Sequence, residues 1–207
     1  MNKNKQEQQI LTKEEKREVR FLSSLEEFKA RGFRAKEYSI SIRTINIVIF
    51  MFGVISGATL GVFNVNFFSI RSLVIAVVII PVIIVLHELL HAIGFTIRKN
   101  IEWKDNIIFG IRLEKMVAYC HCLRPVLVID YFIALMLPFA VLGFGLFVVG
   151  MVVKSNLLIF ASVFNLFSCV GDLIMACCLL FCKKPSFILD KPKGIGYIAL
   201  YQKKDNG

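Results

Sequence analysis

The chain has 207 residues, of which 57% are hydrophobic, and it contains 19 phenylalanines. This composition is more apolar than that of soluble domains and indicates a membrane protein. The formal net charge of +10 is concentrated at the two ends and in one loop, as is usual around membrane spans, so it does not indicate a nucleic-acid partner. The six cysteines lie mostly in or near apolar segments, which argues against a disulfide scaffold.

The N-terminal segment, residues 1–43, is highly charged. It carries eleven Lys or Arg and seven Asp or Glu, and it lacks the apolar core of a signal peptide. Leu22, Leu25 and Phe28 recur at helical spacing within residues 11–37, which permits either an amphipathic helix on the membrane surface or a solvated tail. We expect a charged cytoplasmic tail over residues 1–43.

Apolar stretches follow one another along the rest of the chain. They predict four transmembrane helices at approximately residues 44–63, 72–97, 126–153 and 157–181. Between the second and the third, apolar residues alternate with others on both sides of Glu114-Lys115. This period of two predicts a short cytoplasmic β-hairpin between helices two and three.

The distribution of Lys and Arg predicts the orientation of these helices. The N-terminal segment, the loop at 98–124 and the C-terminal segment hold all but two of the 25 Lys and Arg residues, so the positive-inside rule places them in the cytoplasm. We therefore expect an all-α, multi-pass protein of the cell membrane with both termini cytoplasmic. Its domains would be the tail at 1–43, a four-span membrane domain at 44–182 and a basic tail at 183–207.

The second apolar stretch contains the motif His87-Glu88-Leu89-Leu90-His91. Residues four apart lie on one face of a helix, so both imidazoles can bind one metal ion. Glu88 then lies beside the ion, where a general base can take a proton from water that the metal activates. Three ionisable residues inside a membrane segment are energetically costly, which favours a functional site over chance.

The last apolar stretch contains Asp172, which is the natural third ligand. His87 precedes Arg98 by eleven residues, and Asp172 precedes Lys183 by eleven, so both lie roughly 16 Å from the cytoplasmic ends of parallel helices. Two His and one carboxylate leave the fourth zinc position open for water, as in catalytic sites.

Asp172 ends a polar stripe on the predicted fourth helix. Its members recur at a spacing of three or four residues and are Ser162, Asn165, Ser168 and Asp172. Asn165 is placed to donate hydrogen bonds to the backbone of a substrate or to orient a metal ligand. Gly171 would allow another helix to approach closely.

The loop contains Cys120-His121-Cys122, which resembles a metal site only in composition. Neighbouring residues of a strand point to opposite faces, so the three side chains cannot converge on one ion. We do not expect the two cysteines to bind metal, whereas His121 is a candidate for positioning a substrate.

These motifs together resemble a known family. HELLHAIGF in an apolar stretch, the loop segment YCHCLRP and a late Gly-Asp resemble the putative zincin peptidases, small bacterial membrane proteins that are similar to site-2 proteases, the intramembrane zinc metalloproteases. The resemblance covers about residues 70–200. It implies that His87, His91 and Asp172 bind zinc and that Glu88 is the catalytic acid and base.

The chain departs from site-2 proteases around its third ligand. Those enzymes typically have an Asn-x-x-Pro…Asp-Gly pattern, whereas here no Pro follows Asn165 at that spacing and a Gly precedes Asp172. This difference concerns substrate gating more than the metal site.

The sequence therefore predicts a membrane-embedded zinc metalloprotease that hydrolyses peptides or membrane-protein substrates. Zinc is the one cofactor expected, and we expect the protein to be embedded in the lipid bilayer. One alternative takes the third ligand from the loop, as Glu102 or Glu114. The others are a catalytically silent zinc-binding scaffold or immunity-type protein and a metal transporter, against which the lack of a second translocation carboxylate argues.

Overall fold

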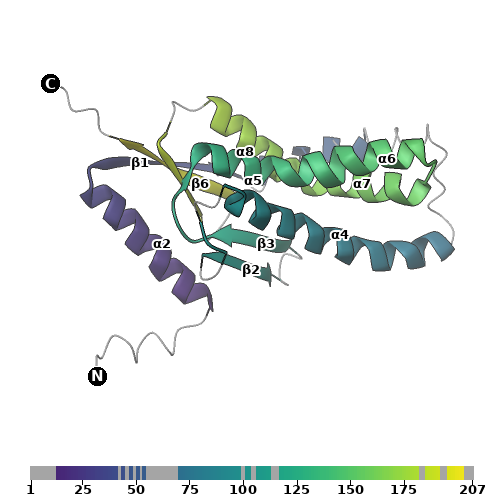
Figure 1. Cartoon of the computed structure of the whole chain (residues 1–207), viewed down its shortest axis with the longest axis horizontal. Helices are drawn as coiled ribbons and strands as arrows, with labels where there is room; N and C mark the ends of the chain where they lie inside the picture. Colours follow the sequence, from purple (N-terminus) through teal and green to yellow (C-terminus); the bar gives the residue numbers. More distant parts are fainter. Residues whose placement is uncertain are drawn as a thin grey trace.

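The computed structural model describes residues 13–41, parts of 43–54, and 70–98, 101–103, 106–112, 117–181, 185–191 and 195–202. Helices run side by side at one end of the molecule, and a sheet and the first helix lie at the other end (Figure 1). The helices are α2 (Lys13–Ala30), α4 (Ile70–Thr96), α5 (Val128–Pro138), α6 (Leu146–Val152), α7 (Asn156–Ser168) and α8 (Val170–Phe181). A π-helical segment, η2 (Phe139–Gly145), joins α5 to α6.

Strands account for the remaining regular structure. A four-stranded antiparallel sheet has the order β1-β6-β5-β4, with β1 at Phe33–Ile40, β4 at Val126–Leu127, β5 at Phe187–Asp190 and β6 at Ile195–Gln202. A separate hairpin consists of β2 (Ile107–Arg112) and β3 (Val117–Cys122). The predicted β-hairpin is thereby confirmed.

The predicted all-α fold with four spans is wrong. Within the described residues, two helices are long and apolar enough to cross a membrane, Val77–Thr96 and Val128–Val152. The pair α7 and α8 makes a third candidate only if it counts as one span, because it bends by 51° at Cys169. The span predicted at 44–63 lies mostly outside the described residues. The protein is a mixed α/β structure.

Three of the four strands that the prediction missed, β1, β5 and β6, lie in the two charged end segments, and the fourth, β4, lies at the start of the predicted third span. β1 pairs with β6 along its whole length, from Phe33 opposite Gln202 to Ile40 opposite Ile195. Lys191, just after β5, also donates to the Glu37 carboxylate on β1. The C-terminal segment was predicted to be a tail because of its Lys residues. It nevertheless contains a short apolar run, IGYIALY, which is typical of a buried strand.

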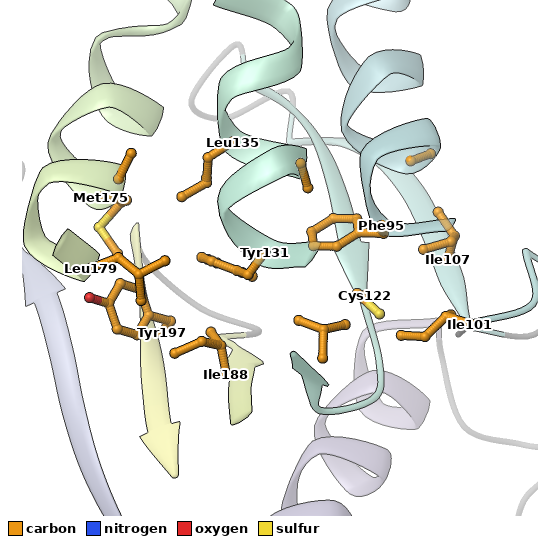
Figure 2. Close-up of a cluster of buried hydrophobic side chains, with 14 of the residues drawn as sticks. Phe95, Ile101, Ile107, Cys122, Tyr131, Leu135, Met175, Leu179, Ile188 and Tyr197 are labelled. Atoms are coloured by element: carbon orange, nitrogen blue, oxygen red, sulfur yellow. The ribbon is translucent and has the colours of Figure 1, made fainter. Parts of the chain in front are cut away.

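β6 is buried on both faces, which explains why this run is continuously apolar. Tyr197 and Ala199 face a core formed with α5 and α8, which includes Tyr131 and Leu179 (Figure 2). Ile198 and Leu200 belong to a second cluster, against which three residues of α2 pack: Phe21, Leu25 and Phe28. The apolar stripe of α2 therefore covers the sheet, an arrangement that neither interpretation of the sequence anticipated.

α4 and α5 approach each other closely at Gly94. A Cβ atom on Gly94 would overlap the backbone of Ala134. Gly171, which we had expected to serve this purpose, has no described atom within 4 Å of such a Cβ position. The sequence identified the right kind of residue on the wrong helix.

Gly94→Ala is therefore expected to destabilise the protein by about 1–3 kcal/mol, as overpacking of a tight core does. Gly171→Ala is the matched control, because it adds the same methyl group to a helix where the described residues leave space. Thermal unfolding in detergent measures both variants. Equal unfolding temperatures for the two would contradict the α4–α5 contact.

Candidate metal centre

The two histidines of the motif converge with one carboxylate. Nε2 of His87 lies 3.0 Å from Nε2 of His91. Oδ2 of Asp172 lies 3.3 Å from the first nitrogen and 3.4 Å from the second. The residues His87 and His91 are buried, with exposed fractions of 5% and 8%. The structure thus brings together the three residues that the sequence singled out as ligands.

Two helices position these ligand atoms. His87 and His91 lie one turn apart on α4, so their rings stack edge to face with centroids 4.7 Å apart. Asp172 lies in the first turn of α8, directly after the bend at Cys169. The bend explains how a short helix, rather than one straight span, places its first carboxylate beside α4.

A proline on α5 determines how His91 is held. Nδ1 of His91 lies 2.8 Å from the carbonyl oxygen of Ala134. In a regular helix this carbonyl would accept from the residue four positions later, which is Pro138 and has no N–H. The free carbonyl accepts a hydrogen bond from His91 Nδ1–H instead. The sequence shows Pro138, but which donor the Ala134 carbonyl receives depends on how α4 packs against α5.

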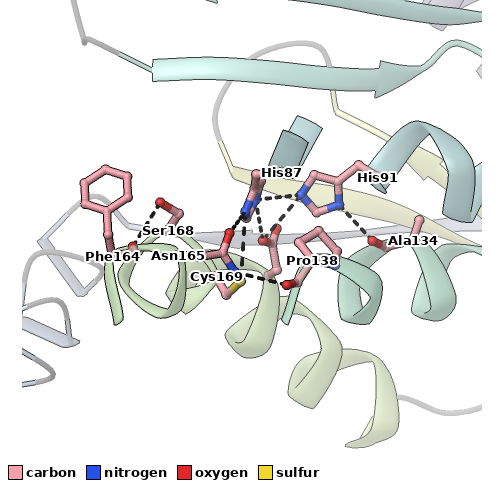
Figure 3. Close-up of polar contacts among 9 residues, drawn as sticks. His87, His91, Ala134, Pro138, Phe164, Asn165, Ser168 and Cys169 are labelled. Atoms are coloured by element: carbon pink, nitrogen blue, oxygen red, sulfur yellow. Dashed lines mark hydrogen bonds and ion pairs between the residues drawn. The ribbon is translucent and has the colours of Figure 1, made fainter. Parts of the chain in front are cut away.

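Asn165 on α7 holds the other imidazole (Figure 3). Its Nδ2 donates to the carbonyl of Pro138 at 3.0 Å, which fixes the orientation of the amide, because a carbonyl can only accept. Oδ1 therefore faces Nδ1 of His87 at 3.0 Å and accepts its hydrogen. These contacts support the orienting role among the two roles that the sequence allowed for Asn165.

The hydrogen bonds on Nδ1 leave the Nε2 lone pair of each neutral imidazole free. Oδ2 of Asp172 is also buried, and it receives no hydrogen bond of normal geometry from the described residues. Two lone pairs and a carboxylate at this separation repel one another unless a metal cation or a proton lies between them. In metal sites, the ring nitrogen of a histidine that does not bind the metal usually donates to a hydrogen-bond acceptor, as both Nδ1 atoms do here.

The spacing of the three atoms fits zinc. In a tetrahedral site with bonds of about 2.0–2.1 Å, neighbouring ligand atoms lie about 3.3–3.4 Å apart. The three separations, 3.0, 3.3 and 3.4 Å, approach this value without rearrangement. The donor set of two imidazoles and one carboxylate is also one that zinc accepts.

Cys169 offers a second possible grouping that the sequence did not indicate. Ligand atoms of His87, Cys169 and Asp172 all lie within 4.8 Å of one another. The sulfur, however, lies 4.0 Å from Nδ1 of His87, the nitrogen already bonded to Asn165, and 3.3 Å from the Asn165 amide. An ion cannot use both ring nitrogens of one imidazole, so the grouping of His87, His91 and Asp172 fits one ion better than the grouping with Cys169.

The hairpin lies beside the motif. Burial raises the pKa of the Cys120 thiol, and the negative charges of Glu88 and Asp190 raise it further, so Cys120 lies within reach of both carboxylates. Burial likewise raises the pKa of Cys122 to about 12. Both thiols are therefore protonated at neutral pH.

His121 makes a contact that the sequence gave no means to find. Its Nδ1 bonds to Oδ2 of Asp190 on β5, and the Tyr131 hydroxyl donates to the other carboxylate oxygen at 3.3 Å. Glu88, half-buried on α4, interacts electrostatically with His121. Of the alternative ligands in the loop, Glu102 is exposed and Glu114 lies outside the described residues.

A family model described as Putative zincin peptidase matches residues 80–187, more than half of the chain. The chain belongs to this family. The match includes the motif, Asn165 and Asp172, whereas Asp190 lies beyond it. Membership in a zincin family implies a metallopeptidase that uses zinc. No curated protein and no solved structure gives a significant match to the chain.

Asn165→Ala in this zincin is expected to weaken zinc binding by about 10–100-fold, because His87 loses the acceptor that orients its ring. Ser162→Ala is the matched control. Ser162 is equally buried on α7 and donates to the carbonyl of Gly143 at 2.7 Å, away from the histidines. Competition with a zinc chelator measures both affinities, and equal loss in the two variants would contradict the orienting role.

Proposed function

We propose that the protein is a membrane-embedded zinc metallopeptidase that hydrolyses peptide bonds of membrane-associated substrates. The observation that carries this proposal is the convergence of His87 Nε2, His91 Nε2 and Asp172 Oδ2, with both Nδ1 atoms held by acceptors. Three protein ligands leave a fourth position for water or substrate, which distinguishes a catalytic zinc site from a structural one.

The membrane location rests on the helices that carry the site. Val77–Thr96, which includes the motif, and Val128–Val152 are each long and apolar enough to cross a bilayer. The pairing of β1 with β6 supports a topology in which both end segments lie on one side of the membrane, and the positive-inside rule favours the cytoplasm as that side. A buried catalytic site within spanning helices is the arrangement of site-2 proteases, and we extend that likeness to this chain.

Glu88 is the residue that we assign to proton transfer. Bound zinc supplies a Lewis acid that polarises the peptide carbonyl and makes water more acidic. Glu88 follows His87 directly and interacts electrostatically with both histidines and Asp172. It takes a proton from the attacking water and returns it to the leaving amine. His121, held by Asp190, faces the same region and positions the substrate.

The test measures zinc and hydrolysis in the same preparation. Purified wild-type protein should contain about one zinc ion per chain, and His87→Ala should contain little, because removing one of three ligands weakens the site strongly. Co-expression with a panel of single-span membrane proteins, followed by cleavage analysis, tests peptidase activity. Zinc bound without any cleavage by the wild type would favour the catalytically silent scaffold, and absence of zinc would reject the metal centre.

A further inference from the structure

An exposed apolar patch lies on the hairpin and on the segment that precedes it. Trp103 and Phe109 stack with ring centroids 5.8 Å apart, and their exposed fractions are 41% and 42%. Ile111, two residues along β2 on the same face, is 69% exposed. We call these three residues the hairpin patch. Three large apolar side chains side by side in contact with water are unfavourable, which points to a partner.

The patch is presented on an ordered scaffold. Ile101 and Ile107, on either side of Trp103 in the chain, are both buried. The N–H of Ile107 donates to the Trp103 carbonyl at 3.3 Å, and the Asn106 amide donates to the Glu102 carbonyl at 2.9 Å. These two hydrogen bonds connect Glu102 and Trp103 to the start of β2, so the exposed Trp103 belongs to an ordered part of the structure.

The position of the hairpin along α4 indicates what covers the patch. β3 lies alongside the C-terminal half of α4 (Figure 1). Cys120 on β3 is within electrostatic reach of Glu88, and Cys120 pairs directly with Phe109. Glu88 precedes Thr96, the last residue of the candidate span, by about two helical turns. Phe109 therefore lies at a level that α4 would occupy inside the membrane.

The exposed surface of α4 continues toward the patch. Its outward side chains are apolar along the span and include Val82, Val85, Leu86, Leu89 and Ile93, and Ile97 directly after the helix is also exposed. Among the described residues, no strand pairs with the outer edge of β2, so its backbone requires contact with water. The boundary between headgroups and acyl chains is the layer that receives apolar side chains and still hydrates a backbone, and tryptophan is enriched there.

We propose that the hairpin patch of Trp103, Phe109 and Ile111 inserts into the lipid interface and anchors the hairpin against the membrane beside the motif helix. The hairpin is then an interfacial element and not a cytoplasmic loop. This inference rests on the proposed membrane location and is independent of zinc and of peptidase activity.

Trp103 is the one tryptophan of the chain, so its fluorescence reports on the patch alone. The full chain is reconstituted into vesicles of phosphatidylcholine and phosphatidylglycerol, with acyl chains brominated either near the headgroup or near the bilayer centre. We expect emission at shorter wavelength than that of tryptophan in water, and strong quenching by bromine near the headgroup. Quenching by aqueous iodide should be weak.

The double variant Phe109→Ser/Ile111→Ser is expected to reduce quenching by brominated lipid and to increase quenching by iodide. Leu22→Ser, which changes an exposed apolar residue on α2, should leave both unchanged. Strong iodide quenching of the wild type would overturn the proposal. Shielding from both quenchers would also overturn it, because the patch would then be covered by protein. Failure of the chain to partition with membranes would instead reject the membrane location.

Discussion

Asp172→Ala should remove most of the zinc from the purified protein. The carboxylate is one of three ligand atoms, and its Oδ2 lies 3.3 and 3.4 Å from the two Nε2 atoms. Affinity should fall by at least the roughly 10–100-fold that changes in supporting residues produce, and hydrolysis should fall with it. Metal analysis by mass spectrometry after gel filtration measures the loss directly.

Asp130→Asn is the matched control for this variant. Asp130 is also a buried acid in the first turn of a helix, α5, but its carboxylate faces the Arg98 guanidinium at 3.4 Å. The control should lose stability and keep zinc. If Asp172→Ala retains zinc as tightly as the wild type while Glu102→Ala or Glu114→Ala does not, the third ligand comes from the loop and the assignment is wrong.

Glu88→Gln should separate metal binding from catalysis. The amide cannot accept a proton from water, so hydrolysis should fall by about 10²–10⁴-fold, the typical contribution of a general base. Zinc content should remain that of the wild type, because Glu88 is not among the converging ligand atoms. Cleavage of a co-expressed substrate, normalised to bound zinc, makes the comparison.

Glu102→Gln provides the control for loss of a carboxylate near the motif, because Glu102 is exposed in the loop after α4. It should retain both zinc and hydrolysis. Unchanged biological function in Glu88→Gln would support the scaffold interpretation, in which the metal serves stability alone. Loss of zinc in Glu88→Gln would show that Glu88 acts as a ligand.

The sequence by itself determined the elements that depend on local spacing. Helical periodicity places His87 and His91 on one face, and both lie on α4. Alternation over 107–122 predicted the hairpin, whose strands pair over the same residues. Both His87 and Asp172 lie eleven residues before the predicted cytoplasmic end of their helix, and this equal depth predicted that they meet. The last apolar stretch, expected as one helix, is bent at Cys169.

Tertiary structure alone decided the features that join distant segments. The pairing of β1 with β6 links residues more than 150 positions apart, and a charge count of the ends contains no information on such pairing. The same limit applies to His121 and Asp190, which lie on different strands and meet only in the folded chain. Long-range contacts of this kind leave no periodic signal in one sequence.

The hydrogen bond that orients His91 separates most clearly what the sequence determined from what the tertiary structure decided. The sequence alone shows that Pro138 lacks an N–H donor, which leaves the Ala134 carbonyl without its helical partner. Which group then uses this carbonyl depended on the close approach of α4 at Gly94, and that group is the His91 Nδ1–H. The sequence determined which groups needed hydrogen-bond partners, and only packing of the helices decided which partners they found, because buried polar groups are satisfied by whatever the fold brings within reach.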